Sequence, residues 1–307
     1  MSETTPKSLA NMFCEHHAIE MRSVGPDLRA LIEGVVAPYY SLMSDITKSP
    51  IATSPDPIDG LLLKMVSRCF DVVEATLLLI ALNKPQPAEA LSRTTMESAV
   101  SALYIADANT ASRFIQYFQS YLKQERNQNR QWLKSLAAVT EPWKEEHERR
   151  ISSKNEFLDA YERLVAQFAM GVGETYPPER GWPKLYDICH ALGKAIEYRT
   201  VYAAMSSQSH HDAEDILNSL GVEGMYPTES QVSILDHERD NFSYHLVIIA
   251  ATYFLELISA CADRFGMEQV KQRTAWSDGQ LDRLLRKVAE NDFVSYQREG
   301  MCQKSRT

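Results

Sequence analysis

The chain has 307 residues, of which 44% are hydrophobic and 24% are charged, and its formal net charge at neutral pH is −9. This composition is typical of a soluble globular protein with a sizeable core, and it excludes collagen-like, low-complexity and disulfide-scaffold proteins. Only 12 glycines and 13 prolines punctuate the chain, so its elements should be long, and long elements are helices. We therefore expect an all-α fold: a single-domain bundle of roughly eight to ten helices, with helix over more than roughly 60% of the chain.

Charge and cysteine usage narrow the class of protein further. Acidic residues outnumber basic ones by 41 to 32, so nucleic acid and anionic membranes should be repelled unless basic residues are concentrated locally. We expect no stable DNA binding. The five cysteines are widely spaced and include no Cys-x-x-Cys pair, which favours buried reduced thiols in a cytoplasmic protein over a zinc site or disulfides.

No targeting or membrane segment is expected. Residues 1–7 are polar and lack the apolar stretch of a secretory signal. The most apolar run, residues 246–262, is interrupted by Glu256, whereas a bilayer span needs roughly 20 consecutive apolar residues. This run therefore predicts a buried core helix, and we expect no membrane association.

Proline, glycine and capping residues divide the chain into predicted helices. In chain order these are 8–49 (broken near 25–26 and bent or interrupted at Pro38), 57–83, 85–107, 114–136, 142–170, 184–192 and 195–210 (two helices, or one helix kinked at Gly193), a short helix after 212, 236–265 and 277–291. Asp56 with Pro57 is typical of a helix start, and Ser277 with Gln280 matches a capping box that predicts the start of the last helix.

The stretch 171–183 is the predicted main loop, and we expect it to be the longest irregular stretch inside the chain. It can divide two domains, but we favour a crossover within one bundle, because neither half closes an obvious core alone. The expected organisation is a disordered N-terminus (1–7), one helical domain (8–293) and a flexible C-terminal tail (294–307).

Arg93 and Glu97 are the first polar residues that stand on an otherwise apolar helix. They lie four residues apart, so their side chains should meet, and Tyr104 continues the same stripe. Two interpretations remain open. The pair can be an internal ion pair that fixes helix register, or Glu97 can be a carboxylate held in a polar pocket.

A second stripe contains Tyr198, Tyr202, Ser206 and His210, which recur every four residues. Hydroxyls and an imidazole in a row can hold a proton relay, a phosphate or a water, or they can form a self-satisfied buried network. If the protein is an enzyme, His210 is the better base, because the neighbouring hydroxyls can orient its ring.

A metal site is a further alternative, built from Glu97, His210, His211 and Asp215. Nothing in the spacing demands a metal, so we expect none. We also expect no cofactor, because the sequence has no Gly-rich phosphate loop, Rossmann fingerprint, His-Glu-x-x-His or Gly-x-Ser-x-Gly motif.

Arg239 and His245 form a third candidate pair, with a spacing that resembles the Arg-x(4–6)-His pattern of the HEPN nuclease superfamily. In such a site the His can act as general base toward a ribose 2′-hydroxyl and the Arg can stabilise charge on the phosphate. On a regular helix, however, the two residues are about 240° apart around the axis. A surface Arg and an ordinary core His are the alternative.

The remaining charge pattern is a basic stripe: Lys123, Arg126, Arg130 and Lys134. The next predicted helix carries four acidic residues: Glu141, Glu145, Glu146 and Glu148. We favour charge pairing across a helical hairpin over an RNA-binding groove.

Three motifs together resemble a bacterial family of helical domains of unknown function. That family carries Arg-x-x-x-Glu, Arg-Phe-x-x-Tyr and Tyr-x-x-x-Ser-x-x-x-His, found here at Arg93 to Glu97, Arg113 to Tyr117 and Tyr202 to His210. The resemblance covers residues 60–265 and implies an all-α fold with a polar pocket where the motifs meet, without an established activity. A resemblance in helical layout to HEPN proteins is weaker.

The predicted site has two sets of residues. The catalytic candidates are His210, Glu97, Arg93 and Ser206, with Arg239 and His245 as the alternative pair. The ligand-pocket candidates are Tyr104, Arg113, Tyr117, Tyr198, Tyr202 and His211.

Two functions remain open. The first is a HEPN-like ribonuclease or toxin in bacterial stress response or defence, acting as a homodimer on RNA. The second is a non-catalytic helical module that binds a small ligand or a partner protein through its polar pocket.

Overall fold

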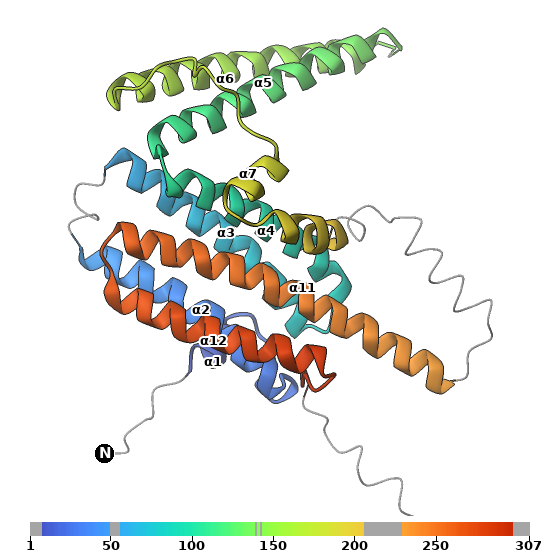
Figure 1. Ribbon diagram of the computed structural model, residues 1–307. Helices are drawn as coiled ribbons and strands as arrows, with labels where there is room; N and C mark the ends of the chain where they lie inside the picture. The colour runs from blue at the N-terminus through green and yellow to red at the C-terminus, as the bar shows by residue number, and fades with distance from the viewer. Residues whose placement is uncertain (1–7, 50–55, 139, 142, 206–228, 297–307) are drawn as a thin grey trace, which may run out of the picture. The chain divides into compact units, whose positions relative to one another are not determined.

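The part of the protein that the structure describes consists mainly of helices (Figure 1). The computed structural model describes residues 8–49, 56–138, 140–141, 143–205 and 229–296, with side chains for all of these except 229–238. Helices account for 83% of the described residues and no strand occurs among them, which confirms the predicted all-α class. The chain divides into two compact units, residues 1–104 with 188–307 and residues 105–187. That 8–293 fold as one domain stays a prediction.

The first unit contains most of the helices. They are α1 (Leu9–His16), η1 (Met21–Ser23), α2 (Pro26–Lys48), α3 (Pro57–Ala81), α4 (Pro85–Asp107, up to Tyr104), α7 (Leu185–Ala191, from Ile188), α8 (Ala195–Glu197), the π-helix η4 (Tyr198–Tyr202), α11 (Glu229–Arg264) and α12 (Glu268–Ala289). α11 packs against α12, α2 and α3, and Figure 1 shows α2, α11 and α12 running alongside one another.

Several helix boundaries follow from the local sequence as predicted. The Asp56 side chain accepts a hydrogen bond from the Ile58 backbone N–H at 2.8 Å, and Pro57 is the first residue of α3. α3 ends before Asn83, which adopts a left-handed conformation with φ 57°. α4 then begins at Pro85, and Gly193, with φ +74°, separates α7 from α8.

One expected helix boundary differs in the structure. The last helix begins at Glu268 rather than at Ser277, which is a fully buried residue inside α12. Gly266, with φ +66°, ends α11, so the turn that starts α12 lies before the Ser277 pattern. α2 continues through Pro38, which excludes an interruption there, and a bend at Pro38 stays a prediction.

α11 holds the core of the first unit. Among the described helices, one segment, Arg239–Arg264, is long and apolar enough to cross a membrane by length and composition. An 18-residue window of this segment has a mean hydropathy of 1.8, and 67% of that window is buried inside the protein. Its apolar side chains pack on other helices, as expected of the core helix of a bundle.

The second unit is a helical hairpin. α5 (Thr110–Ser135) continues into η3 (Leu136–Ala138), and α6 (Trp143–Gly171) packs back against α5. Leu122, Ile151 and Leu158 are among its buried side chains. The segment 172–184 follows without helix and is the longest irregular stretch among the described residues. It overlaps the predicted loop 171–183 except for one residue at each end.

The C-terminal end of the described chain packs back onto the first unit. The Gly25 N–H donates to the Ser295 carbonyl at 2.7 Å, and Val24 forms a bridge with Tyr296. These contacts place residues 294–296, which the sequence assigns to a flexible tail, beside the start of α2. The four described cysteines are buried and unbridged, as expected: Cys14, Cys69, Cys189 and Cys261.

Candidate functional site

α4 positions the first two residues of the candidate site. Arg93 and Glu97 lie one helical turn apart, and the Arg93 Nε donates to the Glu97 Oε1 at 2.9 Å. The Arg93 side chain is 23% exposed and the Glu97 side chain is 39% exposed. The pair therefore lies at the border between core and solvent, where a ligand can reach it.

The π-helix η4 brings Tyr202 to this pair from 105 residues further along the chain. The Tyr202 hydroxyl donates to the Glu97 Oε1 at 2.7 Å and accepts from the Arg93 Nη2 at 3.0 Å. The Arg93 guanidinium also lies 5.1 Å from the centre of the Tyr202 ring. The three side chains are joined pairwise by hydrogen bonds, and we name them the Arg93–Glu97–Tyr202 cluster.

The local geometry of η4 supports this cluster. Tyr198 and Tyr202 stand at the two ends of the π-helix, and their rings stack with centres 4.8 Å apart and an interplanar angle of 15°. Short π-helical turns are rare overall, but those that occur often lie at functional sites. The stacked pair holds the Tyr202 hydroxyl in one direction, toward α4.

The electrostatics of the cluster fix the protonation of two of its members. Burial, and next the hydrogen bond to the Glu97 carboxylate, raise the pKa of the Tyr202 hydroxyl. Burial lowers the pKa of Arg93, but the hydrogen bonds that Arg93 donates to Glu97 and Tyr202, with their charges, outweigh burial, and the pKa is raised. At neutral pH Tyr202 is therefore a neutral donor and Arg93 a cation.

The Glu97 carboxylate can accept further hydrogen bonds. Both donors bind its Oε1, and no group among the described residues hydrogen-bonds to its Oε2. A carboxylate oxygen that is held in place and partly exposed can accept a hydrogen bond from a ligand or take a proton.

Several residues of the predicted pocket lie outside the described part of the chain. These are Ser206, His210 and His211, together with Asp215 of the alternative metal set. Their convergence with Glu97 stays a prediction. Within the described ranges, no group of three or more His, Cys, Asp and Glu side chains is arranged to hold a metal ion.

Three further predicted pocket residues are Tyr104, Arg113 and Tyr117, and their convergence with the cluster stays a prediction. Tyr104 lies on α4 at the end of the first unit. Arg113 and Tyr117 belong to the second unit, where Arg113 pairs with Asp107 at 3.3 Å and the Tyr117 ring lies 5.0 Å from that of Trp182. A shared pocket for all three motifs stays a prediction.

The alternative catalytic pair, Arg239 and His245, stands on α11, and its role stays a prediction. Both residues stand on one continuous helix, so they are about 240° apart around its axis. Arg239 is exposed, whereas His245 is half-buried and burial lowers the pKa of its imidazole. This arrangement fits an ordinary core histidine and a surface arginine.

Sequence reasoning missed Glu89. It lies one turn before Arg93 on the same stripe of α4, is only 1% exposed, and forms a hydrogen bond with the Ser243 hydroxyl of α11. A buried glutamate is rare without partners, so this contact ties the stripe to the core helix. The four-residue spacing of Glu89, Arg93 and Glu97 was the available signal.

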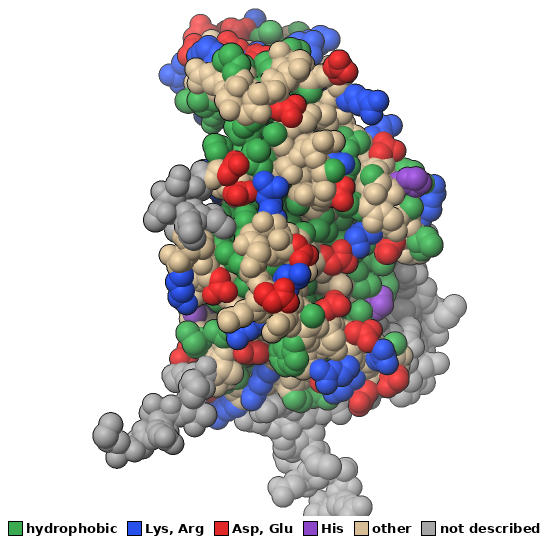
Figure 2. Space-filling model, turned by 60° about the vertical axis from the view of Figure 1, so that its left-hand side comes forward, with side chains coloured by type: hydrophobic (Ala, Val, Ile, Leu, Met, Phe, Trp, Pro, Cys, Tyr) green, Lys and Arg blue, Asp and Glu red, His purple; other side chains and the backbone are tan. Residues whose placement is uncertain are grey.

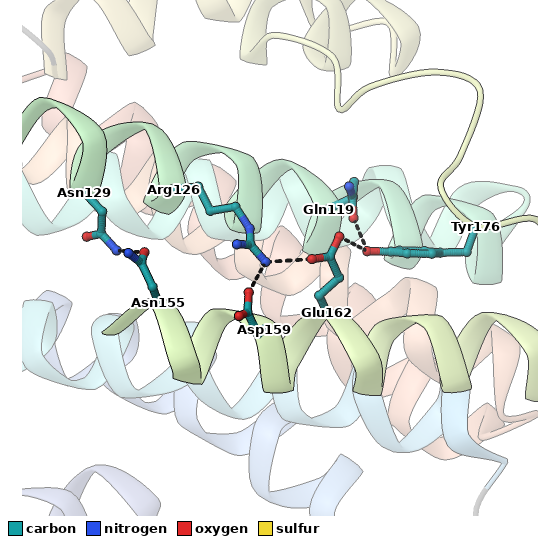
Figure 3. Close-up of polar contacts among 7 residues, drawn as sticks. All are labelled: Gln119, Arg126, Asn129, Asn155, Asp159, Glu162 and Tyr176. Atoms are coloured by element: carbon teal, nitrogen blue, oxygen red, sulfur yellow. Dashed lines mark hydrogen bonds and ion pairs between the residues drawn. The ribbon is translucent and has the colours of Figure 1, made fainter. Parts of the chain in front are cut away.

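A second polar network lies in the hairpin of the second unit (Figure 3). Arg126 of α5 contacts Asp159 at 2.8 Å and Glu162 at 2.6 Å on α6, and the Tyr176 hydroxyl lies 2.6 Å from the Gln119 Oε1. The basic stripe therefore pairs across the hairpin through Arg126, but with acidic residues other than the expected ones. Glu146, one of those expected, pairs with Arg149 and Arg150 on its own helix.

The charge on the visible surface is mixed. Figure 2 shows Lys and Arg side chains interspersed with Asp and Glu side chains over the face drawn. Nucleic-acid-binding surfaces gather basic residues on one face or along one helix. The face drawn does not have that character.

Fold and cluster together define an all-α bundle protein with a partly exposed Arg–Glu–Tyr site. The chain belongs to a family of unknown function (DUF5677), whose model matches residues 59–225. The matched region includes α4 and η4, and so the whole cluster. No curated protein and no solved structure matches the chain.

Proposed function

We propose that the protein is a binding module that recognises a small ligand through the Arg93–Glu97–Tyr202 cluster. The ligand donates an N–H hydrogen bond, as an amine, amidine or guanidinium group does. One observation carries the proposal: Glu97 is fixed by two donors at Oε1, while its Oε2 has no partner in the described part of the chain and its side chain is 39% exposed.

The chemistry of the cluster supports this ligand class. The Glu97 Oε1 accepts hydrogen bonds from Arg93 and Tyr202, and a carboxylate can accept at both of its oxygens. Charge-assisted hydrogen bonds to such an oxygen are about twice as strong as neutral ones. The net charge of −9 favours approach of a cation over an anion.

Thermal unfolding in the presence of candidate ligands tests the proposal. The probes are agmatine, spermidine and cytidine, with citrate as an anionic control. A ligand at 100 times its Kd stabilises the folded state by about 2.7 kcal/mol, so at least one donor should raise the Tm measurably and citrate should not. Glu97→Gln should abolish the shift, because it keeps the shape of the side chain and removes its charge.

The matched control is Asp282→Asn, which removes a carboxylate from the exposed pair with Arg286 on α12. It should keep the full ligand shift. The proposal is wrong if none of the donors shifts the Tm of the wild type, or if Glu97→Gln keeps the shift.

A HEPN-like ribonuclease is the second candidate function. It is favoured by the pairing of a carboxylate with a guanidinium and a phenol, groups that can move a proton and neutralise a phosphate during RNA cleavage. In this proposal His210 takes the proton of a ribose 2′-hydroxyl and Arg93 binds the phosphate, in a homodimeric cytoplasmic protein of bacterial stress response or defence.

Cleavage of a fluorescent single-stranded RNA tests this candidate. His210→Ala should lower the rate by about 10²–10⁴-fold with the fold intact, whereas His245→Ala should mainly lower the Tm. An activity that survives His210→Ala but is lost in folded Arg239→Ala or His245→Ala variants would assign the site to α11 instead.

A further inference from the structure

A small cavity lies in the core of the first unit, between α3, α4 and α11. Five aliphatic side chains and two threonines, Thr76 and Thr95, line it. Its volume is about 10 Å³. One buried water needs about 10–15 Å³, provided that polar groups bind it.

The Thr95 hydroxyl is the polar group that stands out there. Thr95 is 1% exposed, and its Oγ1 has no hydrogen-bond partner among the described residues. Three other buried helical hydroxyls donate to the carbonyl four residues earlier, at 2.8 Å for Thr76 and Thr274 and 2.9 Å for Ser92. Thr95 does not use this common solution, although it faces a space large enough for one water.

We propose that this cavity holds one ordered water that bridges the hydroxyls of Thr95 and Thr76. The Thr76 hydrogen is engaged by the Val72 carbonyl, so the Thr76 oxygen accepts a hydrogen bond from the water. Thr95 then donates to the water or accepts its second hydrogen. Both threonine hydroxyls are satisfied, and the water has the two partners that a buried water requires.

This water ties α4 to α3 behind the candidate site. Thr95 lies between Arg93 and Glu97 in sequence and about 200° from Arg93 around the helix axis. The bridge therefore acts on the core face of α4 while Arg93 and Glu97 lie on the face toward Tyr202. It positions α4 without contacting the ligand, and it does not depend on the proposed function.

Thr95→Val in the full-length protein tests the bridge, because the sign of its effect depends on the water. If the water is present, the substitution removes one of its two partners and the Tm falls. If the cavity is dry, valine replaces an unsatisfied buried hydroxyl and the Tm stays the same or rises. Thr274→Val is the matched control, because the buried Thr274 hydroxyl is already bonded within its own helix.

The expected result is a larger fall of the Tm for Thr95→Val than for Thr274→Val, with a crystallographic density peak within hydrogen-bond distance of both hydroxyls. The proposal is overturned if the Tm of Thr95→Val falls no further than the Tm of Thr274→Val. It is also overturned if a crystal structure with a well-ordered core lacks that density peak.

Discussion

His245 links the burial of α11 to the pH dependence of stability. Burial lowers the pKa of its imidazole below the ordinary value of 6.5, so the folded protein binds this proton less readily than the unfolded chain. The contribution of the neutral His245 to the stability of the fold is therefore fully present above pH 6.5. It is lost as the pH falls through the lowered pKa of the folded protein. The Tm of the wild type should fall between about pH 7 and 5 more steeply than that of His245→Gln. Equal slopes for the two proteins contradict this assignment.

Asp27 anchors the C-terminal end of the described chain. Its side chain is 8% exposed, binds the Lys287 Nζ at 2.6 Å and accepts the Val294 N–H at 2.8 Å. Asp27→Asn removes the charge that raises the pKa of Lys287 through their hydrogen bond. We expect a loss of about 1–2 kcal/mol in urea unfolding and faster amide exchange at Val294.

The exposed pair of Asp282 and Arg286 provides the comparison for Asp27. Asp282→Asn should cost less than about 0.5 kcal/mol, because exposed pairs four residues apart on a helix contribute little. Equal losses for the two variants would show that the Asp27 contacts do not anchor the segment.

At the scale of elements, the α5–α6 hairpin contains an amide pair, of which Asn129 is buried and Asn155 is half-buried. Asn129 is 2% exposed and its Nδ2 donates to the Asn155 Oδ1 at 2.8 Å, while its own Oδ1 has no partner in the described residues. Buried asparagines of this kind fix helix register at a cost in stability. Replacing both residues by leucine should raise the Tm, measured by calorimetry. A lower Tm would show that the amide pair stabilises the hairpin on balance.

The sequence predicted those helix boundaries that are determined by residues within one turn of the helix end. The Asp56 cap and the prolines at 57 and 85 act within one helical turn, so α3 and α4 begin where expected. The Ser277 pattern failed because the same residues are compatible with a buried helix interior, and the burial against neighbouring helices decides between them.

The candidate site was only partly predictable for the same reason. The spacing of Arg93 and Glu97 gave their contact, because it depends on one helix. The burial of Glu89 depends on Ser243, which is 154 residues away in sequence, and the π-helical turn of η4 depends on packing that no local pattern encodes. Contacts of this range require the folded structure.

At the scale of the whole molecule, the two units should differ in how strongly their backbone amides are protected from hydrogen exchange. α11 is covered by α12, α2 and α3, whereas α6 packs in its unit against α5. Amides in cores exchange only through large openings, and those in less covered helices through smaller ones. Hydrogen-exchange mass spectrometry should therefore find the slowest amides in 244–262 and faster exchange in α6. Comparable protection in both segments would contradict this picture.

The central claim is that Arg93, Glu97 and Tyr202 form one hydrogen-bonded cluster joining α4 to η4. A double-mutant cycle of Glu97→Gln and Tyr202→Phe in urea unfolding tests it most directly, with helix content checked by circular dichroism. Residues that share a hydrogen bond couple by about 0.5–3 kcal/mol, and we predict a coupling in this range. Losses that add to within about 0.3 kcal/mol would show that the two residues do not interact, and would contradict the account.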